Sequence, residues 1–131
     1  MKAKLDEPLS YEILRTLRWP KGVVCPYCEQ MRVTTHTKSA LTPRRRYLCV
    51  NCRRTFTDLT GTPFASTNLP LRIWLLSLRL IGEVKVTSEL AKALNVKWDT
   101  AAYIQRRLAM PLSRPGLIRR LREALQMNAM G

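Results

Sequence analysis

Hydrophobic residues recur at helical spacing toward both ends of this 131-residue chain and follow a β-like pattern between them. Residues 9–18 carry an apolar stripe, which predicts a short helix capped by Ser10 and ended by Pro20. Within residues 23–58, two β-favouring runs flank a turn near Pro43 and predict a small antiparallel ribbon. The two runs are residues 33–37 and 46–48.

The hydrophobic pattern in the second half of the chain predicts helices only. Residues 70–82 are apolar on more than one face, so we expect a central helix that is packed on both sides. A shorter helix is expected at residues 87–94, with Thr87 or Ser88 as its cap and Asn95 in a left-handed turn after it. Two further helices are predicted at residues 98–109 and 116–128.

Four cysteines form two C-x-x-C pairs, which are separated by twenty residues. They are Cys25, Cys28, Cys49 and Cys52. This spacing predicts one structural zinc ion held by four thiolates, with no open position for substrate. Two disulfides would need an oxidising compartment, and a redox C-x-x-C usually occurs once, beside a βαβ pattern. His36 lies between the pairs and is an alternative ligand, but four sulfurs already complete the shell.

The fold class predicted from these patterns is a small α+β protein, in which a four-cysteine zinc ribbon of short antiparallel strands precedes an all-α helix-turn-helix domain. We divide the chain into four parts. They are an N-terminal helix and lead-in (1–22), the zinc ribbon (23–68), the helix-turn-helix (69–110) and a basic C-terminal helix (111–131).

The charge of the chain indicates which class of partner it binds. Lysine and arginine number 23 against 9 acidic residues, so the formal net charge is +14. A zinc ion with four thiolates lowers this charge by two, and the balance still predicts a polyanionic partner, most often nucleic acid. An anionic membrane is the competing partner, but the longest apolar run, residues 73–81, is too short to span a bilayer.

The second helix of a helix-turn-helix lies in the major groove, and its outward side chains contact base edges. Here that helix buries Ala101, Ile104 and Leu108, and the remaining faces present the candidate contacts. These are Lys97, Trp98, Tyr103, Gln105, Arg106 and Arg107. Arg106 suits guanine and Gln105 suits adenine. The alternative is that these charges only solvate an exposed helix.

Two other basic groups accompany the helix. One lies along the ribbon and comprises Lys38, Arg44, Arg45, Arg46, Arg53 and Arg54. Arginine binds phosphate through a planar fork, so this edge is predicted to hold DNA backbone, or else an acidic protein surface. The other group lies on the C-terminal helix, whose apolar face is expected to dock on something, such as a second copy in a homodimer.

No catalytic constellation is apparent. The nine acidic residues are scattered, His36 has no obvious partner, and no P-loop, H-E-x-x-H or G-x-S-x-G motif occurs. We therefore expect a protein that is not an enzyme. The alternative is an enzyme that needs a partner's carboxylates, with Asp58 or Asp99 as its own contribution.

Several motifs are similar to one family. They are Arg18-Trp19-Pro20, Cys25-Pro26-x-Cys28, Arg46-Tyr47-x-Cys49-x-x-Cys52-Arg53-Arg54-x-Phe56, Thr60-Gly61-Thr62-Pro63-Phe64 and Leu69-Pro70-Leu71-Arg72-x-Trp74. In this order they resemble the N-terminal half of zinc-ribbon insertion-sequence transposases, over about residues 9–110. The resemblance implies a structural zinc ion, binding to transposon-end DNA and a location in the bacterial cytoplasm or nucleoid.

The chain also departs from that family. No position matches a catalytic aspartate of the Asp/Asp/Glu domain, and Lys97 stands where the family usually has a small capping hydroxyl. The expected function is therefore zinc-dependent, sequence-specific binding of duplex DNA by a non-catalytic, transposase-derived regulator, end-binding protein or targeting subunit. The alternative is a basic zinc-ribbon subunit of a ribonucleoprotein or of another protein complex.

Overall fold

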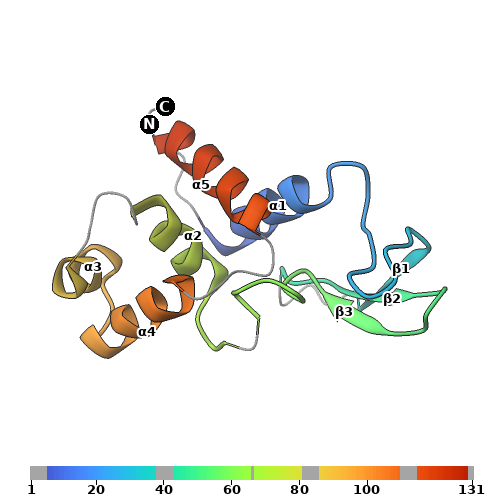
Figure 1. Cartoon of the computed structure of the whole chain (residues 1–131), viewed down its shortest axis with the longest axis horizontal. Coiled ribbons are helices and arrows are strands. Elements are labelled where there is room, and N and C mark those ends of the chain that lie inside the picture. The colour runs from blue at the N-terminus through green and yellow to red at the C-terminus, as the bar shows by residue number, and fades with distance from the viewer. Residues whose placement is uncertain (1–5, 38–42, 66, 81–85, 110–114, 130–131) are drawn as a thin grey trace.

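The protein is an α+β molecule in which, over the described residues, a small antiparallel sheet adjoins a group of five helices (Figure 1). The structure is a computed structural model and describes residues 6–37, 43–65, 67–80, 86–109 and 115–129. In chain order the elements are α1 (Glu7–Arg18), β1 (Val33–Thr37), β2 (Arg46–Cys49), β3 (Thr55–Thr57), α2 (Leu71–Leu80), α3 (Thr87–Leu94), α4 (Trp98–Ala109) and α5 (Pro115–Ala129).

The sheet has the strand order β1-β2-β3, and both pairs are antiparallel. The two strands predicted from β-favouring runs are present, with β2 one residue longer than expected. The third strand was not predicted, because Thr55–Thr57 is too short to give a pattern of its own. It pairs with β2, and Tyr47 lies opposite Phe56. Most of the connection between β1 and β2, including the position of Lys38, lies outside the described residues.

Helix α1 begins earlier than its apolar stripe suggests. The Asp6 side chain caps it by accepting a hydrogen bond from the Leu9 amide at 2.9 Å. Ser10 is instead buried inside the first turn, where its hydroxyl donates to the Asp6 carbonyl oxygen. The prediction that Ser10 caps this helix is therefore wrong, because Asp6 offers an acceptor directly before the helical residues.

Helix α2 is the centre of the helical core, as its all-round apolar pattern predicted. Trp74 and Leu75 are fully buried, and α2 packs against α1, α3 and α5. The Phe64 ring, from the connector between β3 and α2 (residues 58–70), lies 5.7 Å from that of Trp74. This helix is therefore enclosed by other helices of its own chain.

Helices α3 and α4 form a compact pair joined by a short turn. Asn95 has the left-handed conformation expected of it (φ 56°, ψ 49°), and its amide donates to carbonyl groups at the end of α3. The capping prediction is wrong, because Val86 occupies the N-cap position without a side-chain hydrogen bond. Thr87 instead donates its hydroxyl hydrogen to the Gln105 side chain at 2.5 Å, which ties the start of α3 to α4.

Helix α5 docks on its own chain. Its apolar residues Leu117, Ile118, Leu121 and Leu125 are buried against α1 and α2. A second copy is therefore not needed to cover this face, and the possible homodimer stays a prediction without that support. Within the described residues, no helix is long and apolar enough to cross a bilayer.

Candidate metal centre and nucleic-acid interface

The four cysteine sulfurs converge on one point. All four Sγ atoms lie within 4.8 Å of one another, and Cys25–Cys52 and Cys28–Cys49 are separated by 3.6 and 3.5 Å. A tetrahedral zinc ion with Zn–S bonds of about 2.3 Å requires S–S edges of roughly 3.8 Å. The arrangement therefore fits one zinc ion with a closed shell of four thiolates.

The two cysteine pairs lie on two backbone turns of the same kind. The amide after each pair, at Glu29 and at Arg53, donates to the carbonyl oxygen of the first cysteine at 2.9 and 2.8 Å. Both residues have a φ of 63°, which is the left-handed region that glycine enters most easily. The two turns are thus equivalent supports for the metal, but the first presents a carboxylate and the second a guanidinium group.

Polar groups around the sulfurs favour metal binding. A backbone hydrogen bond at Gln30 is the main cause that lowers the pKa of Cys28 to about 6, and the Asn51 side chain also contributes. A backbone hydrogen bond at Arg54 lowers the pKa of Cys52, but burial and the other thiols raise it overall, to about 11. Thiolates this close repel one another. A metal cation that displaces the protons of the remaining thiols therefore stabilises the cluster.

An aromatic cluster packs against the metal centre. Trp19, Tyr47 and Phe56 are buried beside Cys25 and Cys49. The Tyr47 and Phe56 rings have centroids 5.2 Å apart, and Trp19 contacts both edge-on. Phe56 thus packs beside the second cysteine pair, and this cluster is separate from the helical core.

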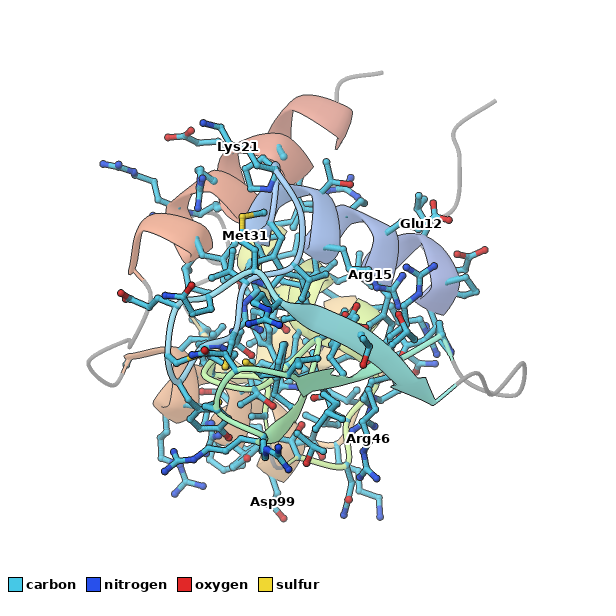
Figure 2. The ribbon with its side chains drawn as sticks, turned by 90° about the vertical axis from the view of Figure 1, so that its right-hand side faces the viewer. Glu12, Arg15, Lys21, Met31, Arg46 and Asp99 are labelled. Carbon is cyan, nitrogen blue, oxygen red and sulfur yellow. The ribbon has the colours of Figure 1, made fainter. Side chains whose placement is uncertain are left out.

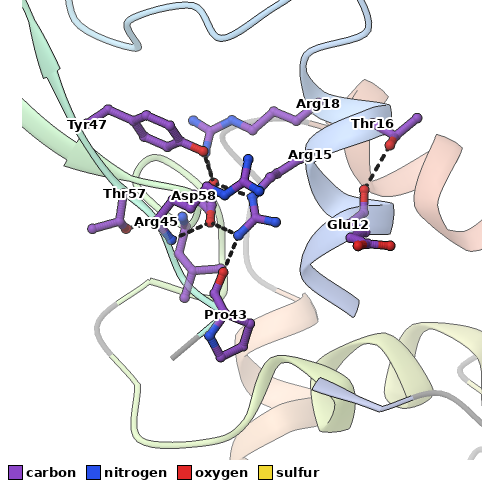
Figure 3. Close-up of polar contacts among 10 residues, drawn as sticks. Glu12, Arg15, Thr16, Arg18, Pro43, Arg45, Tyr47, Thr57 and Asp58 are labelled. Atoms are coloured by element: carbon purple, nitrogen blue, oxygen red, sulfur yellow. Dashed lines mark hydrogen bonds and ion pairs between the residues drawn. The ribbon is translucent and has the colours of Figure 1, made fainter. Parts of the chain in front are cut away.

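Asp58 is the polar centre between the ribbon and α1 (Figure 3). Its carboxylate is fully buried and accepts hydrogen bonds from Arg15, from the Arg45 amide at 2.8 Å and from the Tyr47 hydroxyl at 2.6 Å. The Arg15–Asp58 ion pair is 2.9 Å long. Arg15 also bonds to the Pro43 carbonyl. Through Asp58, these contacts hold the backbone at Arg45, which belongs to the basic ribbon edge, against Arg15 of α1.

Sequence reasoning missed this role of Asp58 and considered it only as a catalytic carboxylate. The residue follows directly after β3, a strand too short to be predicted, so the sequence offered no local signal for this role. Its partners Arg15 and Tyr47 come from α1 and β2, at sequence separations of 43 and 11. Such a network depends on tertiary contacts, so no local pattern indicates it.

Two arginines fasten the connector between the sheet and α2. Arg18 is buried and donates to the backbone carbonyls of Asp58 and Thr60. Arg107, from α4, donates through Nε to Pro63 and through Nη2 to Ala65, each at 2.8 Å. The connector is therefore bonded to α1 on one side and to α4 on the other, which fixes the ribbon relative to the helix pair.

The predicted contact residues of α4 divide into two groups. Lys97, Trp98 and Arg106 are exposed, and Trp98 is 57% accessible. Tyr103 is only partly exposed, and its ring packs on the helical core 6.1 Å from that of Trp74. Gln105 is engaged by the Thr87 hydroxyl, and Arg107 by the connector. Two residues of the predicted set, Trp98 and Arg106, therefore remain presented on this helix, and Lys97 is presented directly before it.

The ribbon edge presents most of its predicted cations. Arg44, Arg45, Arg46, Arg53 and Arg54 are exposed. Arg44 also hydrogen-bonds to the Tyr11 hydroxyl, and burial raises the pKa of that tyrosine. The Arg54 guanidinium lies 5.0 Å from the ring centroid of the exposed Tyr27. Lys38 lies outside the described residues.

Among the described residues, few of the positive charges are paired with a carboxylate. Over the part of the chain that the structure describes, Arg15–Asp58 is the one ion pair within 4 Å. Figure 2 shows Asp99, on the outward side of α4, at the bottom of the view and Arg46 toward the lower right. The outward side of α4 and the ribbon edge are thus both open to a large polyanion.

The comparisons agree with this geometry. Residues 5–55 match the family model described as the transposase zinc-ribbon domain. The N-terminal part of the chain is therefore similar to transposase zinc ribbons, as its motifs predicted. The chain is also 36% identical, over 77 residues, to "Uncharacterized protein in transposable element ISH50" from Halobacterium salinarum. The similarity covers 59% of this chain and 26% of that relative. No solved structure matches the chain.

Proposed function

We propose that this chain binds double-stranded DNA as a recognition part of a transposition system and is not itself catalytic. The carrying observation is the α3–α4 pair, whose left-handed turn at Asn95 leads into a helix with exposed Lys97, Trp98 and Arg106. Helix α4 enters the major groove, and Arg106 contacts a base edge there. The transposase zinc ribbon at residues 5–55 supports transposon-end DNA as the target.

The ribbon has a separate task in this proposal. Its exposed Arg45, Arg46 and Arg53 hold backbone phosphates, while the zinc ion keeps their positions fixed. The connector bonds from Arg18 and Arg107 support one rigid reader rather than two loosely linked modules. Phosphate contacts on the ribbon therefore set the orientation in which α4 meets the bases.

Tryptophan fluorescence tests the placement of α4. Trp98 is 57% exposed, whereas Trp19 and Trp74 are 9% and 0% exposed, so acrylamide quenches Trp98 selectively. We expect saturating duplex DNA to protect this emission from acrylamide in the zinc-loaded protein. A Trp98→Phe variant is the control that identifies the quenched signal. Unchanged quenching in a DNA complex would show that α4 does not face the duplex.

Substitutions separate base reading from phosphate binding. A target sequence is first selected from a random duplex pool and compared with random duplex. Arg106→Ala should lower affinity for the target by about 1–3 kcal/mol and affect random duplex much less. Arg45→Ala should weaken both alike and reduce the salt dependence by about one phosphate contact. An equal loss on both duplexes with Arg106→Ala would refute base reading.

Competition experiments address the other functions. Structured RNA that displaces the selected duplex at moderate salt would favour a ribonucleoprotein subunit instead. Reproducible DNA cleavage with magnesium, abolished by Asp99→Asn, would contradict the non-catalytic role. We expect neither outcome, because the proposed contacts follow major-groove geometry and Asp99 is the only acidic residue of α4.

A further inference from the structure

The outward face of α5 is a second basic surface. Its buried side is fixed on α1 and α2 by four apolar residues, so the opposite side must face solvent. That side carries Arg119, Arg120 and Arg122, all exposed, with Glu123 as the acidic residue beside them. None of these arginines has a carboxylate within 4 Å among the described residues.

This face points away from α4. Helix α2 separates the two, since α5 packs on α2 while α4 packs on α3 (Figure 1). In Figure 2 the ribbon of α5 lies at the top, and Asp99 of α4 projects at the bottom. A duplex seated on α4 therefore lies on the far side of the molecule from the α5 arginines.

One DNA segment does not reach both faces easily. Duplex DNA has a persistence length of about 150 bp, so it does not curl around a domain of this size without strong external contacts. The α5 arginines lie on a helix that α2 separates from α4 (Figure 1), so they do not extend the footprint of a straight duplex on α4. Their exposed planar forks, which no described carboxylate neutralises, are suited to phosphate oxygens.

We propose that the α5 face binds the phosphate backbone of a second duplex segment, so that one chain bridges two DNA segments. The inference rests on the proposed function, because the first segment is the one held by α4. The second contact involves no base edges and is therefore independent of sequence and sensitive to salt.

A capture assay tests the bridge. The selected duplex is immobilised, the zinc-loaded protein is added, and capture of a fluorescent random duplex is measured at low salt. The test variant is Arg119→Gln/Arg120→Gln/Arg122→Gln, since glutamine has a helix propensity close to that of arginine. The matched control is Lys21→Gln/Arg32→Gln/Arg72→Gln, which removes three exposed charges from other parts of the chain. Circular dichroism verifies that both variants fold.

We expect the α5 variant to lower capture of the second duplex by about tenfold or more, with little change in affinity for the immobilised duplex alone. The control variant should retain capture. Retained capture by the α5 variant would refute the proposal and would indicate bridging by a dimer, which light scattering then detects. A parallel loss of single-duplex affinity would also refute it, because α5 would then contact the first segment. Absence of any duplex binding by the wild type would instead refute the proposed function itself.

Discussion

At the scale of single residues, one buried carboxylate organises the junction of the ribbon and α1. Asp58 has no solvent contact, and its charge is balanced by Arg15 and by two further donors. A buried ion pair of this kind is costly to break from one side, because the remaining charge loses its partner. Asp58 is therefore a positioning residue for the basic edge and not a catalytic one in the proposed function.

Tyr47→Phe tests this junction through its pH dependence. Burial, and then the hydrogen bond to Asp58, raise the pKa of Tyr47 to about 12, above its ordinary value of 10.0. Near pH 8 the variant should be less stable by about 1–2 kcal/mol, because Asp58 loses a donor. As the pH rises from 10 to 12, the tyrosine ionises first in the unfolded chain, so the wild type alone loses about 1.4 kcal/mol per unit.

The stability advantage of the wild type should therefore shrink above pH 10 and reverse near pH 12. Urea unfolding of both proteins, followed by tryptophan fluorescence at several pH values, measures the difference. Tyr27→Phe is the matched control for the loss of a tyrosine hydroxyl, since Tyr27 is 48% exposed. A constant difference between wild type and Tyr47→Phe across this range would contradict the assigned hydrogen bond.

At the scale of elements, the start of one helix caps another. Glu7, the first residue of α1, accepts hydrogen bonds from the Leu71 and Arg72 amides at 2.9 and 2.8 Å. These amides belong to the first turn of α2, where no helical carbonyl can serve them and the helix dipole favours negative charge. The two helices are thus joined by a capping contact across 64 residues of sequence.

Glu7→Ala should destabilise the protein by about 1–2 kcal/mol, because the α2 amides lose their acceptor. Glu12→Ala is the matched control on the same helix, because Glu12 is exposed and replacing it should change stability little. Thermal or urea unfolding of the three zinc-loaded proteins provides the comparison. Equal stability of the two variants would show that Glu7 does not cap α2 in solution.

At the scale of the whole molecule, two separate cores carry the fold. The ribbon core contains five buried residues, two of which are cysteines, and its three strands are at most five residues long. Such a sheet is too small to be stable without its metal. The helical core is larger and joins all five helices, with Leu59 and Phe64 entering it from the connector. Zinc is therefore expected to support one half of the molecule much more than the other.

Zinc chelation should unfold the ribbon and leave most of the helical structure intact. We expect far-ultraviolet circular dichroism to change modestly, while the emission of Trp19, which is buried in the ribbon core, shifts to that of an exposed indole. DNA affinity should fall, because the phosphate contacts lose their support. A Cys28→Ser/Cys52→Ser variant should reproduce this state without chelator. Complete loss of helical signal would show that both cores unfold as one cooperative unit.

The sequence by itself determined the features that depend on near neighbours in the chain. Two C-x-x-C pairs identify the metal centre, because the spacing alone places four thiolates on two turns. Asn95 and the apolar periods around it predict the α3–α4 pair for the same reason. The buried face of α4 also followed from its helical period, with Ala101, Ile104 and Leu108 inward.

Only the tertiary structure decided which polar side chains are engaged within the fold and which are presented to solvent. Tyr103 and Arg107 looked like DNA contacts, but one packs against Trp74 and the other holds the connector. Asp58 finds its partners, and Glu7 caps α2, through contacts between segments far apart in sequence. The physical reason is that a charged side chain on a helix surface pairs with whatever the fold brings near it. No local periodicity encodes that neighbour.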